Sequence, residues 1–260
     1  MTKIQFTDGA AYERYMGKWS QLAGGQFLDW LKPAPQQHWL DVGCGNGAFT
    51  QLIVDRCAPS AVIGVDPSAA QLLHARERFS PAIAQFHEGN AMALPLSDGV
   101  ADVAVMPLVI FFVPVPERGV AEMVRVVRFG GLVTAYAWDM QGGGFTYVAL
   151  QDEMARLGYP VPQAPSPEAS RADVLHRLWV DAGLGDVAVR EFSVQRTFEA
   201  FADDWDTILG APSAGPTLNG MPAETLDQLQ SRLRDRLPAD DRGRITYSAR
   251  ANAVRGVRFA

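Results

Sequence analysis

The sequence predicts an α/β protein with a doubly wound, seven-stranded and mostly parallel sheet. Three observations predict this class. From residue 37 onward, short apolar runs rich in β-branched residues alternate with stretches whose apolar residues recur every three or four positions. A glycine-rich loop stands where the first strand should pass into the first helix. The 260 residues are 48% hydrophobic and 20% charged, which is ordinary for a globular protein and excludes a disordered or coiled-coil chain.

The expected strands are the apolar runs bounded by turn residues. They cover residues 38–42, 61–66, 83–87, 102–106, 132–138, 186–194 and 244–254. The helical periodicity between them predicts crossover helices at 48–56, 68–79, 117–127 and 170–182. Such alternation is typical of βαβ units around a parallel sheet. Ser68, which follows Pro67, is placed to cap the second of these helices.

Two segments fall outside this alternation and are expected to be additions to one domain spanning residues 1–260. Tyr12, Tyr15, Met16 and Trp19 follow one another at helical spacing and predict an N-terminal helical lid over residues 1–35. A packing face is the equally open alternative for this stripe. The core is expected at 36–197, a helical insertion at 198–240 and the last strand at 241–260.

Charge and cysteine content restrict the partners and the compartment. The formal net charge of -6 argues against a nucleic-acid binder, which needs a basic surface to displace phosphate counterions. Two cysteines are too few for a disulfide scaffold, and no Cys/His spacing predicts a metal site. Residues 1–10 lack the pattern of a secretory signal, and the apolar stretch 100–115 is shorter than a bilayer span of about 20 residues. We expect a cytoplasmic protein without a membrane partner, whose oligomeric state the sequence leaves open.

The most informative string is LDVGCGNGA at residues 40–48. Glycines at a strand-to-helix turn allow backbone angles that other residues avoid and let a ligand approach the main chain. Gly43, Gly45 and Ala48 also satisfy the fingerprint of a dinucleotide-binding loop, and a match of that kind alone is weak.

Two carboxylates near this loop narrow the choice of ligand. Asp66 ends the second expected strand, 23 positions after Gly43, a spacing that lets a carboxylate accept hydrogen bonds from ribose hydroxyls. Asp41 precedes the loop and would attract an ammonium group but repel a pyrophosphate. S-adenosylmethionine carries such an ammonium and no phosphate.

Two further strings complete a recognisable order of motifs: EGNAMALPLSD at 88–98 and EMVRVVRFGG at 122–131. From about residue 37 to residue 138 the chain resembles the class I S-adenosylmethionine-dependent methyltransferases, and most closely the broad subgroup that includes the ubiquinone/menaquinone-biosynthesis enzymes. The resemblance implies a Rossmann-like methyltransferase fold. This chain departs from the family pattern at Asn90, where Asp is common, and at Phe129, where Pro is common.

The resemblance implies a set of cofactor-binding residues. In the family, the glycine loop lies under the methionine part of the cofactor, the acid closing the second strand binds the ribose, and the residue after the third strand's glycine reads the adenine. Carried over by motif, the expected positions are Asp41, Gly43, Cys44, Gly45, Gly47, Asp66, Pro67, Asn90, Ala91 and Met106.

The expected activity is transfer of a methyl group from S-adenosylmethionine to a small-molecule acceptor, through an O, N, C or S atom that the sequence does not identify. The catalytic residues remain unknown, because the activated donor makes a general base optional; Asp139 and Tyr136 are candidates by position alone. Two alternatives stay open: an NAD(P)-dependent oxidoreductase, and a protein that binds an adenosyl ligand without catalysis.

Aromatic residues flanking the strand ends are candidates for enclosing the acceptor. The expected substrate or lid residues are Tyr15, Trp19, Trp138 and Trp205, and the glycines at 142–144 would let the loop beside them move. After the fourth strand the chain reads MPLV at 106–109, unlike the Asn/Asp-Pro-Pro-aromatic string of enzymes that methylate base amino groups. This difference also favours a small-molecule acceptor.

Overall fold

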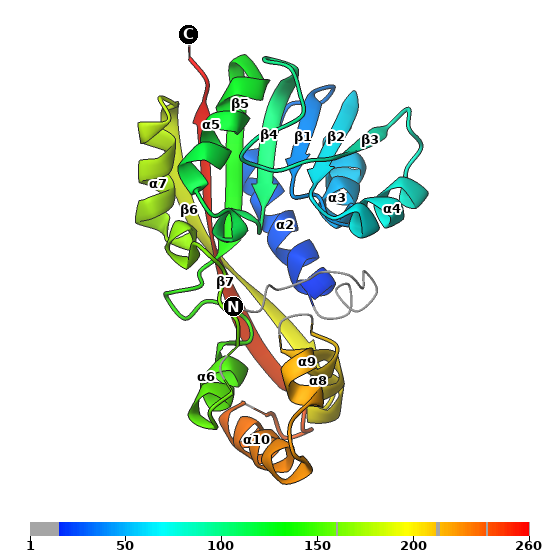
Figure 1. The fold of residues 1–260 in the computed structure, drawn as a ribbon, viewed down its shortest axis with the longest axis vertical. Helices are drawn as coiled ribbons and strands as arrows, with labels where there is room; N and C mark the ends of the chain where they lie inside the picture. The colour runs from blue at the N-terminus through cyan, green and yellow to red at the C-terminus, as the bar shows by residue number, and fades with distance from the viewer. Residues whose placement is uncertain (1–15, 160, 212–213, 238, 260) are drawn as a thin grey trace.

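The computed structural model describes residues 16–159, 161–211, 214–237 and 239–259. It contains one seven-stranded sheet in the order β3-β2-β1-β4-β5-β7-β6 (Figure 1). Neighbouring strands are parallel, except that β7 runs antiparallel to both β5 and β6. The strands are β1 (His38–Val42), β2 (Ala61–Asp66), β3 (Ala84–Glu88), β4 (Ala101–Pro107), β5 (Val127–Trp138), β6 (Gly185–Phe198) and β7 (Ile245–Val257). The predicted fold class is confirmed.

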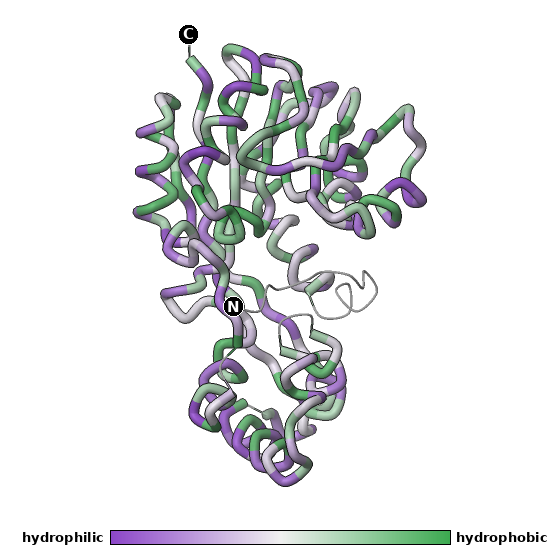
Figure 2. The backbone as a smooth tube through the Cα atoms, viewed as in Figure 1, coloured by the Kyte–Doolittle hydropathy of each residue, from purple (hydrophilic) through white to green (hydrophobic). Residues whose placement is uncertain are grey.

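Helices cover both faces of the sheet. One face carries α2 (Lys18–Leu31), α3 (Ala48–Cys57) and α4 (Ala69–Arg78), and the other carries α5 (Pro116–Val126) and α7 (Ala172–Asp181). The chain moves outward from β1 to β3 and then returns to β4, so right-handed crossovers place the helices before and after that reversal on opposite faces. Figure 2 shows green and purple alternating along α7, as expected for a helix with one buried face. Two short 3-10 helices, η2 (Ile110–Phe112) and η3 (Pro167–Ser170), lie in the connections.

The strand β6 is longer than the sequence predicted, because it continues to Phe198, beyond the sheet. The residues that β7 gains over its predicted range, 255–257, pair with β5 within the sheet. The pairing of β5 with β7 ends at Trp138 and Ala251, whereas β6 and β7 stay paired as far as Phe198 and Ile245. Their far ends therefore leave the sheet as a two-stranded ribbon. Polar side chains such as Gln195 interrupt the apolar pattern there, so periodicity did not extend the predicted strand.

The ribbon carries a second lobe, which lies below the sheet in Figure 1. Its helices are α6 (Val148–Arg156), α8 (Phe201–Leu209), α9 (Gly215–Asn219) and α10 (Ala223–Arg236). The sequence predicted helices between residues 198 and 240 but not α6. Glu153 of α6 is buried and ion-paired with Arg236 of α10 at 2.9 Å, and Arg232 lies 3.8 Å from its other oxygen. These pairs join α6 to the inserted helices, so the lobe is assembled from two separate segments of the chain.

The described part of the expected N-terminal lid is a packing helix. Met16 and Trp19 are buried, and α2 lies against α3, β6 and β7. A Cβ on Gly24 would come 2.7 Å from the side chain of Leu52, so this glycine permits the close approach of α2 to α3. Tyr12 and Tyr15 lie outside the described residues. For Met16 and Trp19, the packing alternative is the one that the structure supports.

Candidate cofactor site

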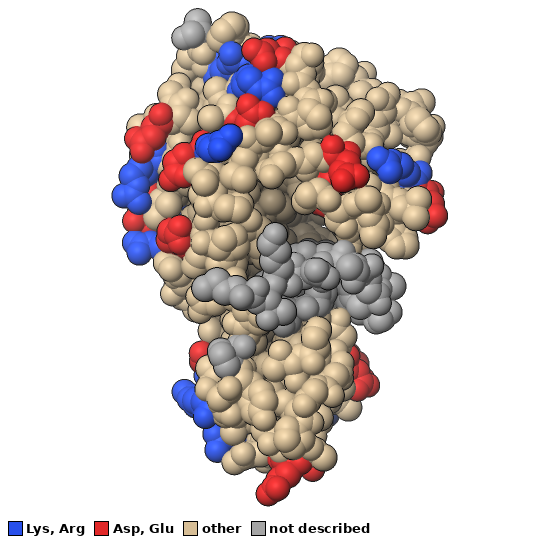
Figure 3. Space-filling view, viewed as in Figure 1, with Lys and Arg blue, Asp and Glu red and all other residues tan. Residues whose placement is uncertain are grey.

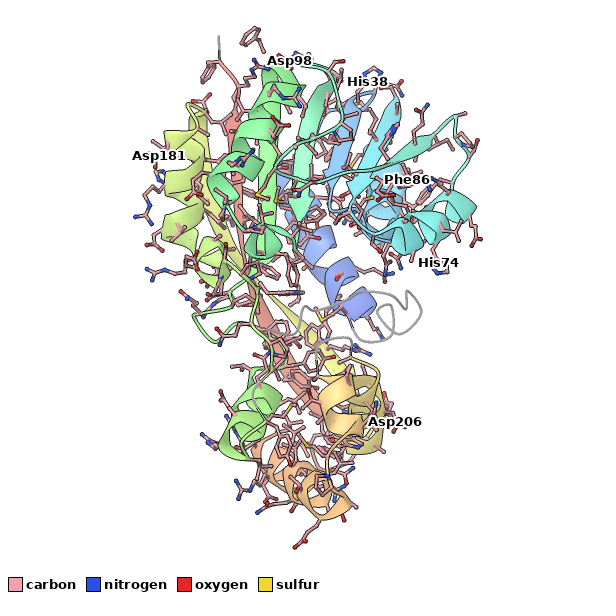
Figure 4. All side chains as sticks on the ribbon, in the orientation of Figure 1. His38, His74, Phe86, Asp98, Asp181 and Asp206 are labelled. Atoms are coloured by element: carbon pink, nitrogen blue, oxygen red, sulfur yellow. The ribbon has the colours of Figure 1, made fainter. Side chains whose placement is uncertain are left out.

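The candidate site lies where the parallel strands end. The arrows of β1 and β4 point toward the lobe in Figure 1, and the loops after β1, β2, β3 and β4 meet along that edge. Chain order reverses between β1 and β4, and in open α/β sheets ligands bind at such a switch point. In Figure 4, His38 and Asp98 lie at the opposite edge and Asp206 lies in the lobe, so none of these three belongs to the site.

The glycine loop after β1 is held against β2. The backbone N–H groups of Gly43 and Cys44 both donate to the carbonyl of Val65, at 2.7 and 3.2 Å. Gly43, Gly45 and Gly47 have φ angles of +75°, +53° and +82°, a region that favours glycine. The positive φ angles of the loop therefore explain why these three positions are glycines. The three differ in the space beside each Cα.

A Cβ atom placed on each glycine would meet different neighbours. On Gly43 it would lie 2.5 Å from the side chain of Val109, and on Gly47 it would lie 2.8 Å from the ring of Phe79. Both positions are closed by packing. On Gly45 the nearest atom would be Oε1 of Gln71, 4.0 Å away. Gly45 is thus the loop glycine with open space beside its Cα, as a bound ligand requires.

Asp41 lies at the end of β1 and is completely buried. Its Oδ2 accepts a hydrogen bond from the hydroxyl of Thr50 at 2.7 Å, while Oδ1 has no partner among the described residues. Burial raises the pKa of Asp41 to about 7, the nearby charge of Asp66 raises it further, and the Thr50 hydrogen bonds oppose the shift. An unpartnered buried carboxylate oxygen is costly, and a ligand ammonium would satisfy it.

Asp66, at the end of β2, connects the glycine loop to α4. Its Oδ2 accepts from the N–H of Gly45 at 2.9 Å and its Oδ1 accepts from the N–H of Ser68 at 2.8 Å. Burial raises the pKa of this carboxyl, and the two backbone hydrogen bonds oppose the shift. Each oxygen retains capacity for a second hydrogen bond. Ser68 caps α4 by accepting a hydrogen bond from the N–H of Gln71, as predicted. Pro67, between Asp66 and Ser68, is exposed.

Three of the motif residues make local contacts that differ from the implied roles. The Oδ1 of Asn90 accepts from the N–H of Met92 at 2.8 Å, so the turn alternative describes its geometry, although a second lone pair remains; Ala91 is half-buried within this turn. Met106 is completely buried, with its Cε beside Gly119 of α5. Its side chain therefore belongs to the core rather than to the strand edge, because it points to the face covered by α5.

The Cys44 side chain also faces the interior. Its Sγ would lie 2.8 Å from a Cβ on Gly64 of β2, so it packs against the sheet, and only its backbone faces the loop. Burial raises the pKa of the thiol well above its ordinary value. A protonated, buried thiol is a poor nucleophile, in agreement with the sequence interpretation of Cys44 as a small loop residue.

Asp139 and Tyr136, the positional candidates for a general base, both have structural contacts: Asp139 is hydrogen-bonded and Tyr136 is packed in the core. Asp139 accepts from Nε of Arg250 at 3.0 Å and from the N–H of Gly142 at 2.9 Å. Tyr136 is buried, with ring centroids 4.8 Å from Phe27. The loop at 142–144, which the sequence predicts to move, is held by Arg250. The guanidinium of Arg250 donates to the carbonyl of Gly142 at 2.6 Å, and its backbone N–H donates to the carbonyl of Gly144 at 2.8 Å.

The expected substrate residues are not brought into one cluster. Trp138 is buried at the end of β5, and its indole N–H has no partner within the described ranges. Trp19 packs on Tyr247, with ring centroids 5.4 Å apart. Trp205 stacks on Phe201 inside the lobe at 6.2 Å, and Tyr15 lies outside the described residues. A single aromatic enclosure around the acceptor is therefore not what these residues form.

The described residues contain no group of three His, Cys, Asp or Glu side chains that could hold a metal ion. Within the same ranges, every helix is too short or too polar to cross a bilayer. Figure 3 shows Lys and Arg interspersed with Asp and Glu on the face in view.

The comparison with protein families gives a match over the same segment as the motifs. Residues 40–135 match the family model described as a methyltransferase domain. These residues form a class I methyltransferase domain. The family resemblance seen in the sequence is thereby confirmed at this level, whereas the ubiquinone-type subgroup stays a prediction.

Relatives of the methyltransferase domain cover part of the chain. An uncharacterised methyltransferase of Mycobacterium tuberculosis is 31% identical over 135 residues, 52% of this chain and 53% of the relative. Trans-aconitate 2-methyltransferase of Acidovorax sp. is 41% identical over 71 residues, 27% of each chain. This chain thus matches about half, or less, of the length of these curated relatives.

Solved structures share the fold of the methyltransferase domain at low identity. Phosphoethanolamine N-methyltransferase 2 of Haemonchus contortus, in complex with S-adenosyl-L-methionine, has a TM-score of 0.60 and 17% identity and covers 96% of this chain and 56% of its own. The YcgJ protein of Bacillus subtilis has a TM-score of 0.56 and 15% identity, covering 92% and 98%. S-adenosylmethionine is the methyl donor of this domain class, and the unpartnered oxygen of Asp41, the open side of Gly45 and the strand-end Asp66 fit it.

Proposed function

We propose that this protein transfers the methyl group of S-adenosylmethionine to a small-molecule acceptor at the carboxyl edge of the sheet. The observation that carries the proposal is Asp41, a fully buried carboxylate with one oxygen lacking a partner among the described residues, on the strand that leads into the loop of Gly45. A pyrophosphate at this position would face a negative charge, whereas the ammonium of the methionine moiety would be attracted. The buried acid therefore supports the methyl donor over a nicotinamide dinucleotide.

Each residue has a defined part in this proposal. Asp41 binds the ammonium, Asp66 accepts hydrogen bonds from the ribose while holding the N–H of Gly45, and the glycine loop lies under the methionine chain. Asn90 and Ala91 border the adenine. The bound donor supplies an already activated sulfonium methyl. Because Asp139 is engaged by Arg250, the chain contributes alignment and exclusion of water rather than a general base from this position.

A small acceptor is supported by charge and by the relatives. The net charge of -6 offers no surface for tracking phosphates. The names of the Haemonchus contortus and Acidovorax sp. enzymes refer to small acceptors, phosphoethanolamine and trans-aconitate. A cytoplasmic location goes with this proposal, since Cys44 and Cys57 are both free thiols.

Binding and turnover are tested separately. Calorimetry should give micromolar binding of S-adenosylhomocysteine and no binding of NADH; tight NADH binding would replace the proposal by the oxidoreductase alternative. Transfer from methyl-labelled cofactor should then label phenols, amines, carboxylic acids or quinone-like acceptors. Binding without any transfer would favour the non-catalytic alternative, and efficient labelling of nucleic acid or protein alone would contradict the small-molecule acceptor.

A further inference from the structure

The lobe contains a small, partly open hollow that is distinct from the strand-edge site. Its volume is about 10 Å³, room for a single water-sized group. The walls come from the residues around α6, from α8 and α10 and from β7: Thr146, Tyr147, Ala149, Leu150, Asp204, Ile208, Leu233, Leu237 and Tyr247. The hollow therefore lies where the separate segments of the lobe meet.

Two polar atoms in the hollow lack partners. Asp204 is completely buried; its Oδ1 accepts from the hydroxyl of Tyr247 at 2.8 Å, whereas its Oδ2 finds no donor in the described part of the chain. The Oγ1 of Thr146, which is also buried, is likewise unpartnered there. Buried polar atoms normally have hydrogen-bond partners, and a carboxylate oxygen can only accept. The hollow is thus built to receive a hydrogen-bond donor.

The remaining walls limit the chemistry of that donor. Leu150, Ile208 and Leu233 are apolar, and the rings of Tyr147 and Tyr247 meet edge to face at 6.3 Å. A carboxylate beside aromatic faces attracts a cation, and a cation with N–H bonds also satisfies both unpartnered oxygens. A primary ammonium has the size of a water molecule and donates three hydrogen bonds, whereas a quaternary ammonium is larger and donates none.

We propose that this hollow binds the primary ammonium group of a small alkylamine, whose alkyl chain leaves past the half-buried Ala149 and Leu237. The ammonium donates to Oδ2 of Asp204 and to Oγ1 of Thr146. Because residues from around α6, from α8 and from β7 then share one ligand, binding also stabilises the lobe. The site does not depend on the proposed methyl transfer.

Charge around Asp204 sets the working pH. Burial raises the pKa of Asp204 to about 6, and the Tyr247 hydrogen bond and the positive charge of Arg196 on β6 oppose that rise. From α10 and the residue that follows it, the hollow is lined by the apolar Leu233 and Leu237. The carboxyl is ionised at pH 8, so the amine binds more tightly at pH 8 than at pH 5.

The test is thermal unfolding of the whole protein in n-propylammonium chloride, compared with equal concentrations of sodium chloride at pH 8. For a Kd near 1 mM, 50 mM n-propylammonium should raise Tm by roughly 5 °C or more, saturably. Asp204→Asn should abolish the shift. The matched control is Asp206→Asn, since Asp206 is exposed on the same helix (Figure 4) and its substitution should leave the shift unchanged.

A second variant keeps the test decisive if Asp204→Asn does not fold. Thr146→Val removes one hydrogen-bond acceptor with little change in side-chain volume. It should raise the n-propylammonium concentration that gives half of the maximal Tm shift several-fold. Tetramethylammonium should give no shift. The proposal is overturned if the unchanged protein shows no shift in Tm or an unsaturable one, or if the Asp204 and Thr146 variants show the same shift as the unchanged protein. A crystal soaked in n-propylammonium that shows only water in the hollow would also overturn it.

Discussion

Asp41 in the sheet and Asp204 in the lobe are two acids with nearly the same local arrangement. Each is completely buried, and each has one oxygen bonded to a hydroxyl, from Thr50 at 2.7 Å and from Tyr247 at 2.8 Å. The other oxygen of each has no partner within the described ranges. Burial is the main cause that raises both pKa values, to about 7 and about 6.

What differs is the structure that surrounds each acid. Asp41 lies on β1 between two parallel neighbours, β2 and β4. The glycine loop that follows β1 is packed against the side chains of Val109 and Phe79. Asp204 belongs to a helix carried by a two-stranded ribbon. In both proposals the unpartnered carboxylate oxygen receives a cationic donor, and the position of each acid in the fold decides which ligand can reach it.

The largest expected effect is that of Asp66→Ala on the sheet site. The variant loses the acceptor for the N–H of Gly45 together with the proposed ribose hydrogen bonds. The binding free energy for S-adenosylhomocysteine should therefore become less favourable by about 2 to 4 kcal/mol. Calorimetry measures this. Asp204→Ala should bind the same ligand normally; unchanged affinity in Asp66→Ala would remove this residue from the site.

Asp41→Asn tests whether the two acids are functionally separate. Loss of the charge that faces the proposed ammonium should cost about 1.5 to 3 kcal/mol of binding free energy for S-adenosylhomocysteine, measured by calorimetry. The hydroxyl of Thr50 can still donate to the amide oxygen, so the fold should be kept. Asp204→Asn is the matched control. Equal losses in both variants would mean that the lobe contributes to the cofactor site.

The affinity of the unchanged protein for S-adenosylhomocysteine should decrease as the pH falls through about 7. Asp41 binds a proton there and no longer attracts the ammonium, so the decrease approaches about tenfold per pH unit below this point. For the unliganded protein the sign is opposite: a raised carboxyl pKa contributes stability at low pH that is lost as the pH rises through about 7. Titration calorimetry from pH 7.5 to 5.5 measures the binding, and a profile of equal slope in Asp41→Asn would assign the titration to another group.

The smallest effect concerns the lobe alone. Glu153→Gln removes the ion pairs between α6 and α10, which should lower the free energy of unfolding by about 1 kcal/mol, a modest cost because the arginines are partly solvated. Burial raises the pKa of Glu153, but the hydrogen bonds and charges of Arg236 and Arg156 lower it overall, so its contribution to stability is present above pH 4.5 and lost in acid. Urea unfolding measures the change, with exposed Glu224→Gln on α10 as the control. A loss of S-adenosylhomocysteine affinity would instead couple the lobe to the sheet site.

Much of the sheet half could be read from the sequence. The predicted ranges 38–42 and 61–66 coincide with β1 and β2, and Ser68 caps α4 as expected. Asp41 and Asp66 were found because a glycine loop and a strand end mark their positions along the chain. Such signals are local: a few consecutive residues determine the turn, the cap and the direction of the side chains.

The lobe was decided by tertiary structure. The helix α6, the overhang of β6 and β7 and the buried Asp204 carry no motif. Asp139, a base candidate by position in the sequence, is engaged by Arg250, 111 residues away. Glu153 and Arg236 likewise meet across 83 residues. By itself the sequence determined the fold class, the methyltransferase motifs and the acids beside the glycine loop. Only folding decided which charged groups are buried together, because contacts between distant segments depend on packing and leave no periodic or local pattern in the chain.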